Sequence, residues 1–192
     1  MLIFILSYLI GSIPFGLLIG KLKGIDIRQH GSGNIGATNV FRTLGPRLGT
    51  LVFILDLLKG AVPVWIALSL TPQHWPVIAA GAAAIIGHSF PIFLKFKGGK
   101  GVATGLGVLL AIAPDIFAVA LVSAIIVIFI SRYVSVGSMF TAVLIALLFW
   151  FWHKPLSYCL AVTLLTGLVL LRHVPNIKRL QHGTEPKIGA RK

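Results

Sequence analysis

The segment from Lys95 to Gly101 combines three lysines with three glycines, and an apolar run begins directly after it. Glycines let a ligand approach backbone N–H groups closely, and a following helix adds the positive end of its dipole. These residue types predict a phosphate-binding loop. The segment does not match the nucleotide-binding Walker motif, because Gly101 stands where that motif has Ser or Thr. A flexible turn with cytoplasmic lysines is the alternative interpretation.

A second polar stretch, Gly31 to Arg42, is dense in small residues and hydrogen-bonding side chains, which suit close contact with a polar ligand. Those side chains are Ser32, Asn34, Thr38, Asn39 and Arg42. Residues 31–36 also match the G-x-G-x-x-G pattern of dinucleotide-binding folds. That fold needs a strand before the glycines, whereas a helix-length apolar run precedes them here, so we reject a dinucleotide site. An ordinary flexible loop is the alternative to a ligand-binding one.

Two charged residues, Asp56 and Lys59, lie within an otherwise apolar run. Charges inside a membrane are costly unless they are paired or face a polar cavity, and residues three apart share one face of a helix. We expect either an ion pair or an acid that steers Arg42. In both cases the expected role is a supporting one rather than a catalytic one.

Polar residues also follow basic positions nearer the C-terminus. Ser135 and Ser138 come just after Arg132 at the start of an apolar run, where a hydroxyl caps a helix or meets an anion, and capping is the more usual role. His173 and Asn176 follow the last apolar run, which places a titratable imidazole and a carboxamide at a membrane surface. An isolated interfacial histidine is the alternative.

Acidic residues are too few and too scattered for several common catalytic designs. The four acids are Asp26, Asp56, Asp115 and Glu185, whereas carboxylate-bridged magnesium needs acids close together. None of the six histidines has an aspartate five residues later, and no Gly-x-Ser-x-Gly sequence is present. We therefore expect no metal and no cofactor, and we expect any acyl chemistry to be direct transfer without an acyl-enzyme.

The elements that position these residues are expected to be membrane-spanning helices. Of the 192 residues, 57% are hydrophobic and 11% are charged, a composition that excludes an ordinary soluble domain. Because about 20 apolar residues cross a bilayer as a helix, the runs predict an all-α polytopic integral membrane protein of about seven helices, in a single domain over residues 1–192. The apolar runs lie near residues 1–20, 48–70, 75–94, 102–113, 116–131, 134–152 and 156–172.

The basic residues predict the orientation of these helices. The chain has 17 Lys and Arg against 4 Asp and Glu, a net charge of +13, and basic loops remain on the cytoplasmic side of a membrane. Seven spans with the N-terminus outside place the basic residues from Lys21 to Lys192 inside, apart from Lys154, which lies outside, and Lys59, which lies within a span. We therefore expect a cytoplasmic C-terminus.

The fourth run, residues 102–113, is too short to cross the membrane. As a helix it rises about 18 Å against a hydrocarbon core of about 30 Å. A half-span is tolerated where protein shields its end or where it lines a cavity. We expect one short half-span here, and this favours the ligand-binding interpretation of the loop at 95–101.

Four stretches taken together resemble one known family. They are residues 11–16, 31–42, 87–107 and 173–187. In their order and spacing the chain is similar, over nearly its whole length, to the acyl-phosphate:glycerol-3-phosphate acyltransferases of bacterial membranes. The resemblance implies an inner-membrane enzyme, with its active site facing the cytoplasm, that joins a fatty acyl phosphate to the 1-hydroxyl of sn-glycerol 3-phosphate. The products would be lysophosphatidic acid and inorganic phosphate, in an early step of phospholipid synthesis.

The resemblance also implies roles for individual residues, with the loop lysine and glycine amides binding phosphate and the last motif positioning glycerol 3-phosphate. The expected catalytic residues are Lys100, Ser32, Arg42, His173 and Asn176. The expected substrate-binding residues are Gly98, Gly99, Gly101, Asn39 and Ser138. The expected supporting residues are Asp56, Lys59 and Glu185, of which the last would tether the basic tail or be purely structural.

The chemistry of an acyl phosphate agrees with this assignment. It is a mixed anhydride with a good leaving group, so the protein needs mainly to hold the attacking hydroxyl against the carbonyl and to stabilise the departing phosphate. The hydroxyl proton passes either to His173 or to an oxygen of the acyl phosphate, and we favour the second route. The expected partners are the two substrates and membrane lipids, with no nucleic acid and no obligate protein partner.

Two other classes of protein fit parts of the sequence. A membrane transporter for a phosphorylated or other anionic small molecule would use the same basic loop, the short fourth helix and the intramembrane Asp56 and Lys59. No convincing pair of internal repeats supports it. A scaffold that recruits acidic partners rests on the basic C-terminus alone. Both alternatives predict binding or flux without phosphate release.

Overall fold

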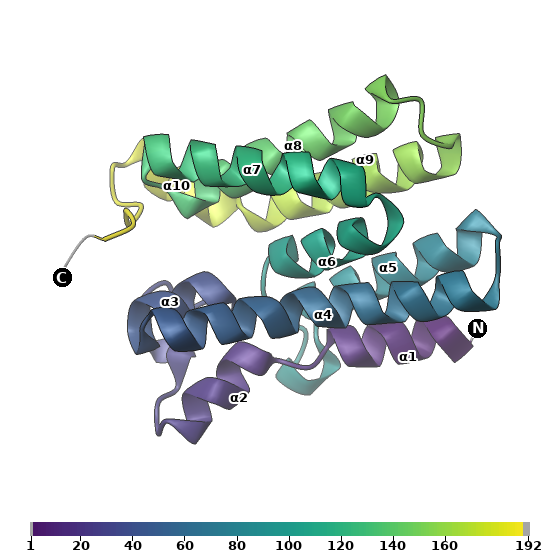
Figure 1. Ribbon diagram of the computed structural model, residues 1–192. Coiled ribbons are helices and arrows are strands. Elements are labelled where there is room, and N and C mark those ends of the chain that lie inside the picture. The colour runs from purple at the N-terminus through teal and green to yellow at the C-terminus, as the bar shows by residue number, and fades with distance from the viewer. Residues whose placement is uncertain (1, 190–192) are drawn as a thin grey trace. The chain divides into compact units, whose positions relative to one another are not determined.

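The computed structural model describes residues 2–189, and the regular elements among them are all helical (Figure 1). This confirms the predicted all-α class. The chain divides into two compact units, Met1–Ile112 and Ala113–Lys192, called unit 1 and unit 2 below. Arg191 and Lys192, for which the sequence predicts a cytoplasmic position, lie outside the described residues.

In unit 1 the long helix α4 packs against α1, α3, α5 and α6. Its α-helices are α1 (Leu2–Gly11), α2 (Phe15–Leu22), α3 (Ala37–Leu44), α4 (Pro46–Leu70), α5 (His74–Ser89) and α6 (Val102–Ile112). Two short 3-10 helices, η1 (Ile27–Gln29) and η2 (Ile92–Leu94), lie in the connections. The loop between η2 and α6 holds the Gly-rich segment.

Small residues let the helices of unit 1 approach closely. A Cβ built on Gly60 of α4 would collide with the carbonyl of Thr104 on α6, and one built on Gly107 of α6 would collide with the carbonyl of Leu57 on α4. Helices in a bilayer gain little from burying apolar surface against one another, so close contact between small residues supports their packing.

The first apolar run forms one candidate span, Leu2–Leu22, but its helix is broken near the middle. Helix α1 ends at Gly11 and α2 begins at Phe15, because Pro14 lacks the backbone N–H that a continuing helix would need. The break exposes the Ile13 carbonyl, which accepts a hydrogen bond of 2.8 Å from Lys59 Nζ. A helix break at membrane depth is tolerated when protein groups satisfy the freed backbone in this way.

Residues 113–189 of unit 2 form three long helices and a short one. They are α7 (Pro114–Ser131), α8 (Val134–Phe151), α9 (Leu156–Arg172) and α10 (Val174–Gln181). Helix α8 packs against both α7 and α9, and the Thr166 hydroxyl of α9 donates a hydrogen bond of 3.0 Å to the Ala142 carbonyl of α8. Helices α9 and α10 meet at His173 with a bend of 50°.

Two short helices, α3 of unit 1 and α10 of unit 2, lie outside the apolar runs of the sequence. Helix α3 lies in the polar segment 21–47, and α10 lies in the basic segment 173–192. Val40 of α3 is fully buried in a cluster with Leu17, Ile27 and Val52, so tertiary packing stabilises a helix too short to form alone. The polar composition of such a segment does not show that a few of its apolar residues form one buried face of a helix.

Five helical segments of residues 2–189 are long and apolar enough to cross a membrane, or six if the bent α9–α10 pair is counted. The α1–α2 pair forms one of these segments, Leu2–Leu22. Helix α6 is apolar but has only 11 residues, which agrees with the short fourth run. The total of about seven spans stays a prediction.

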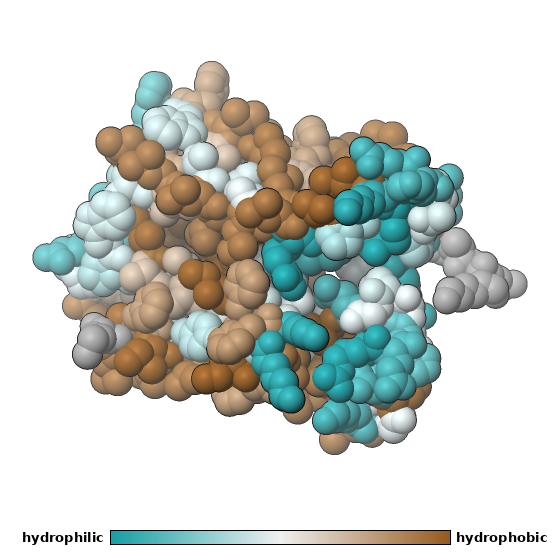
Figure 2. Space-filling view, turned by 180° about the vertical axis from the view of Figure 1, so that it is seen from behind, coloured by the Kyte–Doolittle hydropathy of each residue, from teal (hydrophilic) through white to brown (hydrophobic). Residues whose placement is uncertain are grey.

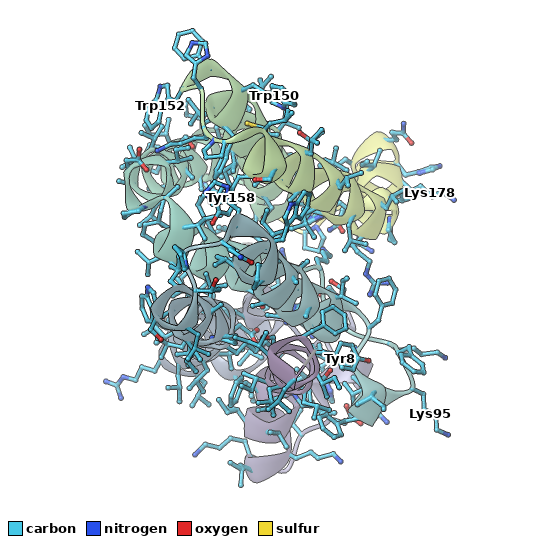
Figure 3. All side chains as sticks on the ribbon, turned by 90° about the vertical axis from the view of Figure 1, so that its right-hand side faces the viewer. Tyr8, Lys95, Trp150, Trp152, Tyr158 and Lys178 are labelled. Atoms are coloured by element: carbon cyan, nitrogen blue, oxygen red, sulfur yellow. The ribbon has the colours of Figure 1, made fainter. Side chains whose placement is uncertain are left out.

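The outer surfaces of the helices are apolar. Figure 2 shows broad hydrophobic surface along them, and residues such as Phe129, at 81% exposure, and Leu164, at 76%, project outward. Trp150 and Trp152 lie together at the C-terminal end of α8 (Figure 3), and tryptophan is enriched where membrane meets water. These surfaces suit contact with lipid.

Candidate active site

The Gly-rich loop is shaped by its own backbone hydrogen bonds. Lys95 and Phe96 both have left-handed backbone angles, with φ of 51° and 62°, a conformation that costs energy for residues other than glycine. The Phe96 N–H donates to the Pro91 carbonyl at 3.0 Å and holds this turn in place. Lys95 points away from the ribbon (Figure 3), whereas Lys100 is half-buried just before α6.

The two central glycines of the loop lie against His88 at the end of α5. The Gly99 N–H donates to the His88 carbonyl at 3.0 Å, and a Cβ built on Gly99 would collide with His88 Nε2. The amide of Gly99 is thus engaged inside the protein. Phosphate binding by Gly99 therefore stays a prediction.

Asp56 and Lys59 form a buried ion pair, as their spacing predicts. Lys59 Nζ lies 2.6 Å from Asp56 Oδ1, and both residues are at most 4% exposed. Lys59 also lies over the Phe15 ring, 5.6 Å from its centroid, and bonds the Ile13 carbonyl. The Nδ1 atom of His88 lies 3.8 Å from Asp56 Oδ1, so the pair reaches the residue that contacts the Gly-rich loop.

Asn39 organises the polar loop that precedes α3. Its amide nitrogen donates to the carbonyls of Ile27, His30 and Asn34 at 2.8 to 3.1 Å, and its Oδ1 accepts from the Ser32 N–H at 2.8 Å. The side chain is 1% exposed. The structure therefore shows Asn39 shaping the loop, and contact with substrate stays a prediction.

The same loop brings Ser32 against the helix that carries Arg42. Because Asn39 bonds Ser32 from α3, the loop folds back onto this helix, and Arg42 lies half-buried one turn beyond Asn39. Gly31 has a left-handed φ of 59°, and a Cβ there would collide with Asn39 Oδ1, so a larger residue would open the fold-back.

Asp26 fixes the start of this loop. Its carboxylate accepts hydrogen bonds from the Arg28 side chain, the shortest of 2.6 Å, and from the Arg28 N–H. These bonds lower the pKa of Asp26 to about 2. Asp26 is therefore ionised at neutral pH and paired within its own turn.

Glu185 is the centre of a polar network in unit 2. Its carboxylate accepts hydrogen bonds of 2.7 Å from Ser135 of α8 and from Asn176 of α10, and it pairs with Arg179 at 2.7 Å. The tail after α10 is thus tied to α8, which is the tethering role expected of Glu185. The capping role expected of Ser135 is wrong, because its hydroxyl binds this carboxylate instead.

The network fixes how Asn176 presents its amide. A carboxylate only accepts, so the NH₂ group must face Glu185, and the buried Oδ1 atom has no hydrogen-bond partner among residues 2–189. Nδ1 of the neighbouring His173, which is 1% exposed, lies 2.7 Å from the Val169 carbonyl. A carbonyl requires a donor, so in a neutral ring Nε2 is the acceptor. Ser138 lies half-buried on α8.

We expect Glu185→Gln to lower the stability of the protein by about 1 to 3 kcal/mol at neutral pH. Burial alone raises the pKa of Glu185, but hydrogen bonds from Ser135, Asn176 and Arg179 outweigh it and lower the pKa below 4.5. The ionised carboxylate therefore stabilises the fold above that pH, and the contribution is lost as the pH falls through the folded-state pKa.

Thermal unfolding in detergent between pH 7 and pH 3.5 measures this effect. The difference between wild type and Glu185→Gln should shrink as the pH falls. Asp115→Asn is the matched control, because Asp115 pairs with Lys154 at 2.8 Å but is 48% exposed, and exposed pairs contribute about 0 to 1 kcal/mol. A difference that stays constant down to pH 3.5 would contradict the assignment.

The predicted residues fall into two groups. Unit 1 holds Ser32, Asn39, Arg42, Asp56, Lys59 and residues 98–101. Unit 2 holds Ser138, His173, Asn176 and Glu185. His88, which lies between the ion pair and the loop, is not among the residues predicted from the sequence, although it lies within the stretch 87–107 on which the family resemblance depends.

The comparisons with known proteins cover almost the whole chain. The family model described as glycerol-3-phosphate acyltransferase matches residues 1–183. A curated glycerol-3-phosphate acyltransferase of Bacillus velezensis is 50% identical over 188 residues, which cover 97% of this chain and 96% of the relative. One of Bacillus subtilis is 49% identical over 189 residues, with the same coverage.

A solved structure agrees with this match. The crystal structure of PlsY, described as an integral membrane glycerol 3-phosphate acyltransferase in its glycerol 3-phosphate form, superposes with a TM-score of 0.95. It is 41% identical and covers 98% of this chain and 94% of its own. The lysophosphatidic acid form of that protein superposes with a TM-score of 0.93 at 40% identity, with the same coverage.

Proposed function

This chain belongs to the glycerol-3-phosphate acyltransferase family, and from that membership we propose that it transfers the acyl group of a fatty acyl phosphate to the 1-hydroxyl of sn-glycerol 3-phosphate. The products are lysophosphatidic acid and inorganic phosphate. The reaction supplies the first acyl chain of a phospholipid. Both units serve this one activity, so that residues 1–192 act as a single acyltransferase domain.

The observation that carries the proposal is the structural match. The neighbour with a TM-score of 0.95 is an integral membrane glycerol 3-phosphate acyltransferase in a glycerol 3-phosphate form, and its second form holds lysophosphatidic acid. One form corresponds to the acyl acceptor and the other to the acylated product. At 41% identity over almost the full chain, the same acceptor and product are proposed for this protein.

The Gly-rich loop supplies the cation that this chemistry needs. Attack of a hydroxyl on the acyl carbonyl breaks the bond between carbonyl carbon and phosphate oxygen, and negative charge leaves with the phosphate. A fixed cation beside the departing phosphate stabilises that charge in the transition state. Lys100, held by the shaped loop at the start of α6, has this role, and Ser32 and Arg42 anchor substrate phosphate.

We propose direct transfer without a metal. Each of the four acidic side chains lies within 2.8 Å of a basic side chain, in the pairs Asp26–Arg28, Asp56–Lys59, Asp115–Lys154 and Glu185–Arg179. A divalent cation bound by any one of these carboxylates would be repelled by the positive charge of that base. Cationic side chains and backbone amides supply the electrostatic stabilisation instead.

The proposed location is the bacterial inner membrane, with the N-terminus outside and the Gly-rich loop and the C-terminus facing the cytoplasm. Basic loops favour this orientation, and the outer helical surfaces are apolar. Substrates with charged phosphates then reach the loop from the cytoplasm, and the acylated product remains in the bilayer. No obligate protein partner is proposed.

The test is a reaction with purified protein in detergent and a metal chelator. Palmitoyl phosphate is supplied with and without glycerol 3-phosphate, and inorganic phosphate and lysophosphatidic acid are both measured. We expect phosphate release that depends on glycerol 3-phosphate and matches the product formed. Turnover with palmitoyl-coenzyme A but not with palmitoyl phosphate would overturn the proposed donor, and activity that the chelator abolishes would overturn direct transfer without a metal.

We expect His173→Gln to lower kcat by about tenfold or less and to leave the pH profile of kcat unchanged. The proposed proton acceptor is a phosphate oxygen of the substrate, so His173 contributes mainly a positioning hydrogen bond, worth about 0.5 to 1.5 kcal/mol. Steady-state rates from pH 5.5 to pH 9 measure this. A loss of about 100- to 10,000-fold together with a changed profile would identify His173 as a general base instead.

A further inference from the structure

We propose that His88 is a positioning residue that sets the place of Lys100 by holding Gly98 and Gly99. The inference rests on the proposed function, because it concerns the loop that binds substrate phosphate. His88 is 4% exposed near the C-terminal end of α5. It acts on the site through the loop rather than by touching substrate.

One side of His88 contacts both glycines. Its carbonyl accepts the Gly99 N–H at 3.0 Å, and a Cβ built on Gly98 would collide with the same carbonyl. For Gly99, the three atoms nearest to a built Cβ all belong to the His88 ring. Gly99 has no left-handed φ, so a glycine is needed there because the imidazole approaches the backbone closely.

The other side of the ring faces the buried ion pair of α4. Nδ1 lies 3.8 Å from Asp56 Oδ1, and Asp56 is held at 2.6 Å by Lys59, which is itself bonded to the Ile13 carbonyl. An imidazole is rigid and this one is buried, so the position of its Nδ1 edge determines that of its Nε2 edge. The ring therefore fills the space between Asp56 and Gly99, and at 3.8 Å it contacts the carboxylate without a hydrogen bond.

Lys100 follows Gly99 directly, so a shift of the glycine moves the cation. A displacement of about 1 Å at a reacting centre costs on the order of 100-fold in rate. The effects of substitutions at positions 88 and 99 should therefore partly cancel when the two are combined. Alanine at position 99 collides with the ring and pushes the loop away, and removal of the ring makes room for that same alanine.

The experiment compares four proteins: wild type, His88→Ala, Gly99→Ala and the double variant. We expect kcat/KM for glycerol 3-phosphate and palmitoyl phosphate to fall about tenfold in His88→Ala and about 100-fold in Gly99→Ala. The double variant should lose about tenfold, so that the second substitution restores activity. Losses that multiply to about 1,000-fold would overturn the proposal.

A matched control separates positioning from loss of packing. Val77→Ala removes a side chain of 1% exposure from the same helix, away from the loop. We expect it to lower the unfolding temperature as much as His88→Ala while kcat and KM stay within about twofold of wild type. Equal activity losses in the two variants would overturn the proposal. If His88→Ala fails to fold, His88→Asn takes its place, because it also vacates the space beside Gly99.

The same four proteins are titrated with glycerol 3-phosphate by calorimetry. A wild type that binds it but transfers no acyl group would overturn the proposed function alone. The affinities of the four proteins for glycerol 3-phosphate then test the role proposed for His88. Affinity that is restored in the double variant supports positioning, and multiplied losses of affinity overturn it.

Discussion

Replacing Lys100 with alanine is expected to lower kcat/KM for acyl transfer by about 100- to 1,000-fold. Removal of one fixed group that stabilises transition-state charge has an effect of this size in other acyl-transfer sites. Lys100 is half-buried in a loop whose shape depends on backbone bonds and on His88. We expect activity to fall in a protein that still folds, and the unfolding temperature measures how much the Lys100 side chain also contributes to stability.

Lysines of the same loop provide the controls for this substitution. Lys95 and Lys97 are exposed, so Lys95→Ala and Lys97→Ala should stay within about twofold of wild type, since screening by water and salt weakens exposed charges. Lys100→Arg keeps the charge with a larger, planar group and should fall between wild type and Lys100→Ala. Phosphate release and product formation are measured together. Near-normal kinetics for Lys100→Ala would remove the proposed role.

The helices could be predicted because the membrane imposes a length on them. An apolar run as long as residues 48–70 predicts a helix that crosses a bilayer, and α4 spans Pro46–Leu70. The break at Pro14 was missed because apolar composition continues through it. The hydrogen bond that makes the break acceptable comes from Lys59, 46 residues later in the chain, and no local pattern contains that information.

Residue types indicated which stretches belong to the candidate site, but they did not indicate how each group is used. Asn39 lies in a polar loop and was predicted to bind a ligand, but its amide nitrogen donates hydrogen bonds to backbone carbonyls of the same loop. The Gly99 N–H was predicted to donate a hydrogen bond to an anion, but it donates to the His88 carbonyl. Whether a hydrogen-bond donor can bind a ligand depends on its neighbours in the folded structure. A single sequence does not show which residues those neighbours are.

Replacing Asp56 with alanine is expected to destabilise the protein by about 3 to 5 kcal/mol. Asp56 and Lys59 are both buried, and removal of one partner leaves the other as an uncompensated buried charge. The loss should extend to the α1–α2 break, because an unpaired Lys59 is less firmly held at the Ile13 carbonyl. Chemical or thermal unfolding in detergent measures the loss.

A double substitution, Asp56→Leu with Lys59→Met, tests the reason for that loss. It removes both charges, so it should recover part of the stability, as apolar replacement of buried pairs does in other proteins. Recovery should be incomplete, because the Ile13 carbonyl loses its donor. Asp115→Ala, at the exposed pair with Lys154, should cost at most about 1 kcal/mol. If Asp56→Ala were as stable as wild type but inactive, the carboxylate would belong to the chemistry rather than to the frame that holds His88 and the loop.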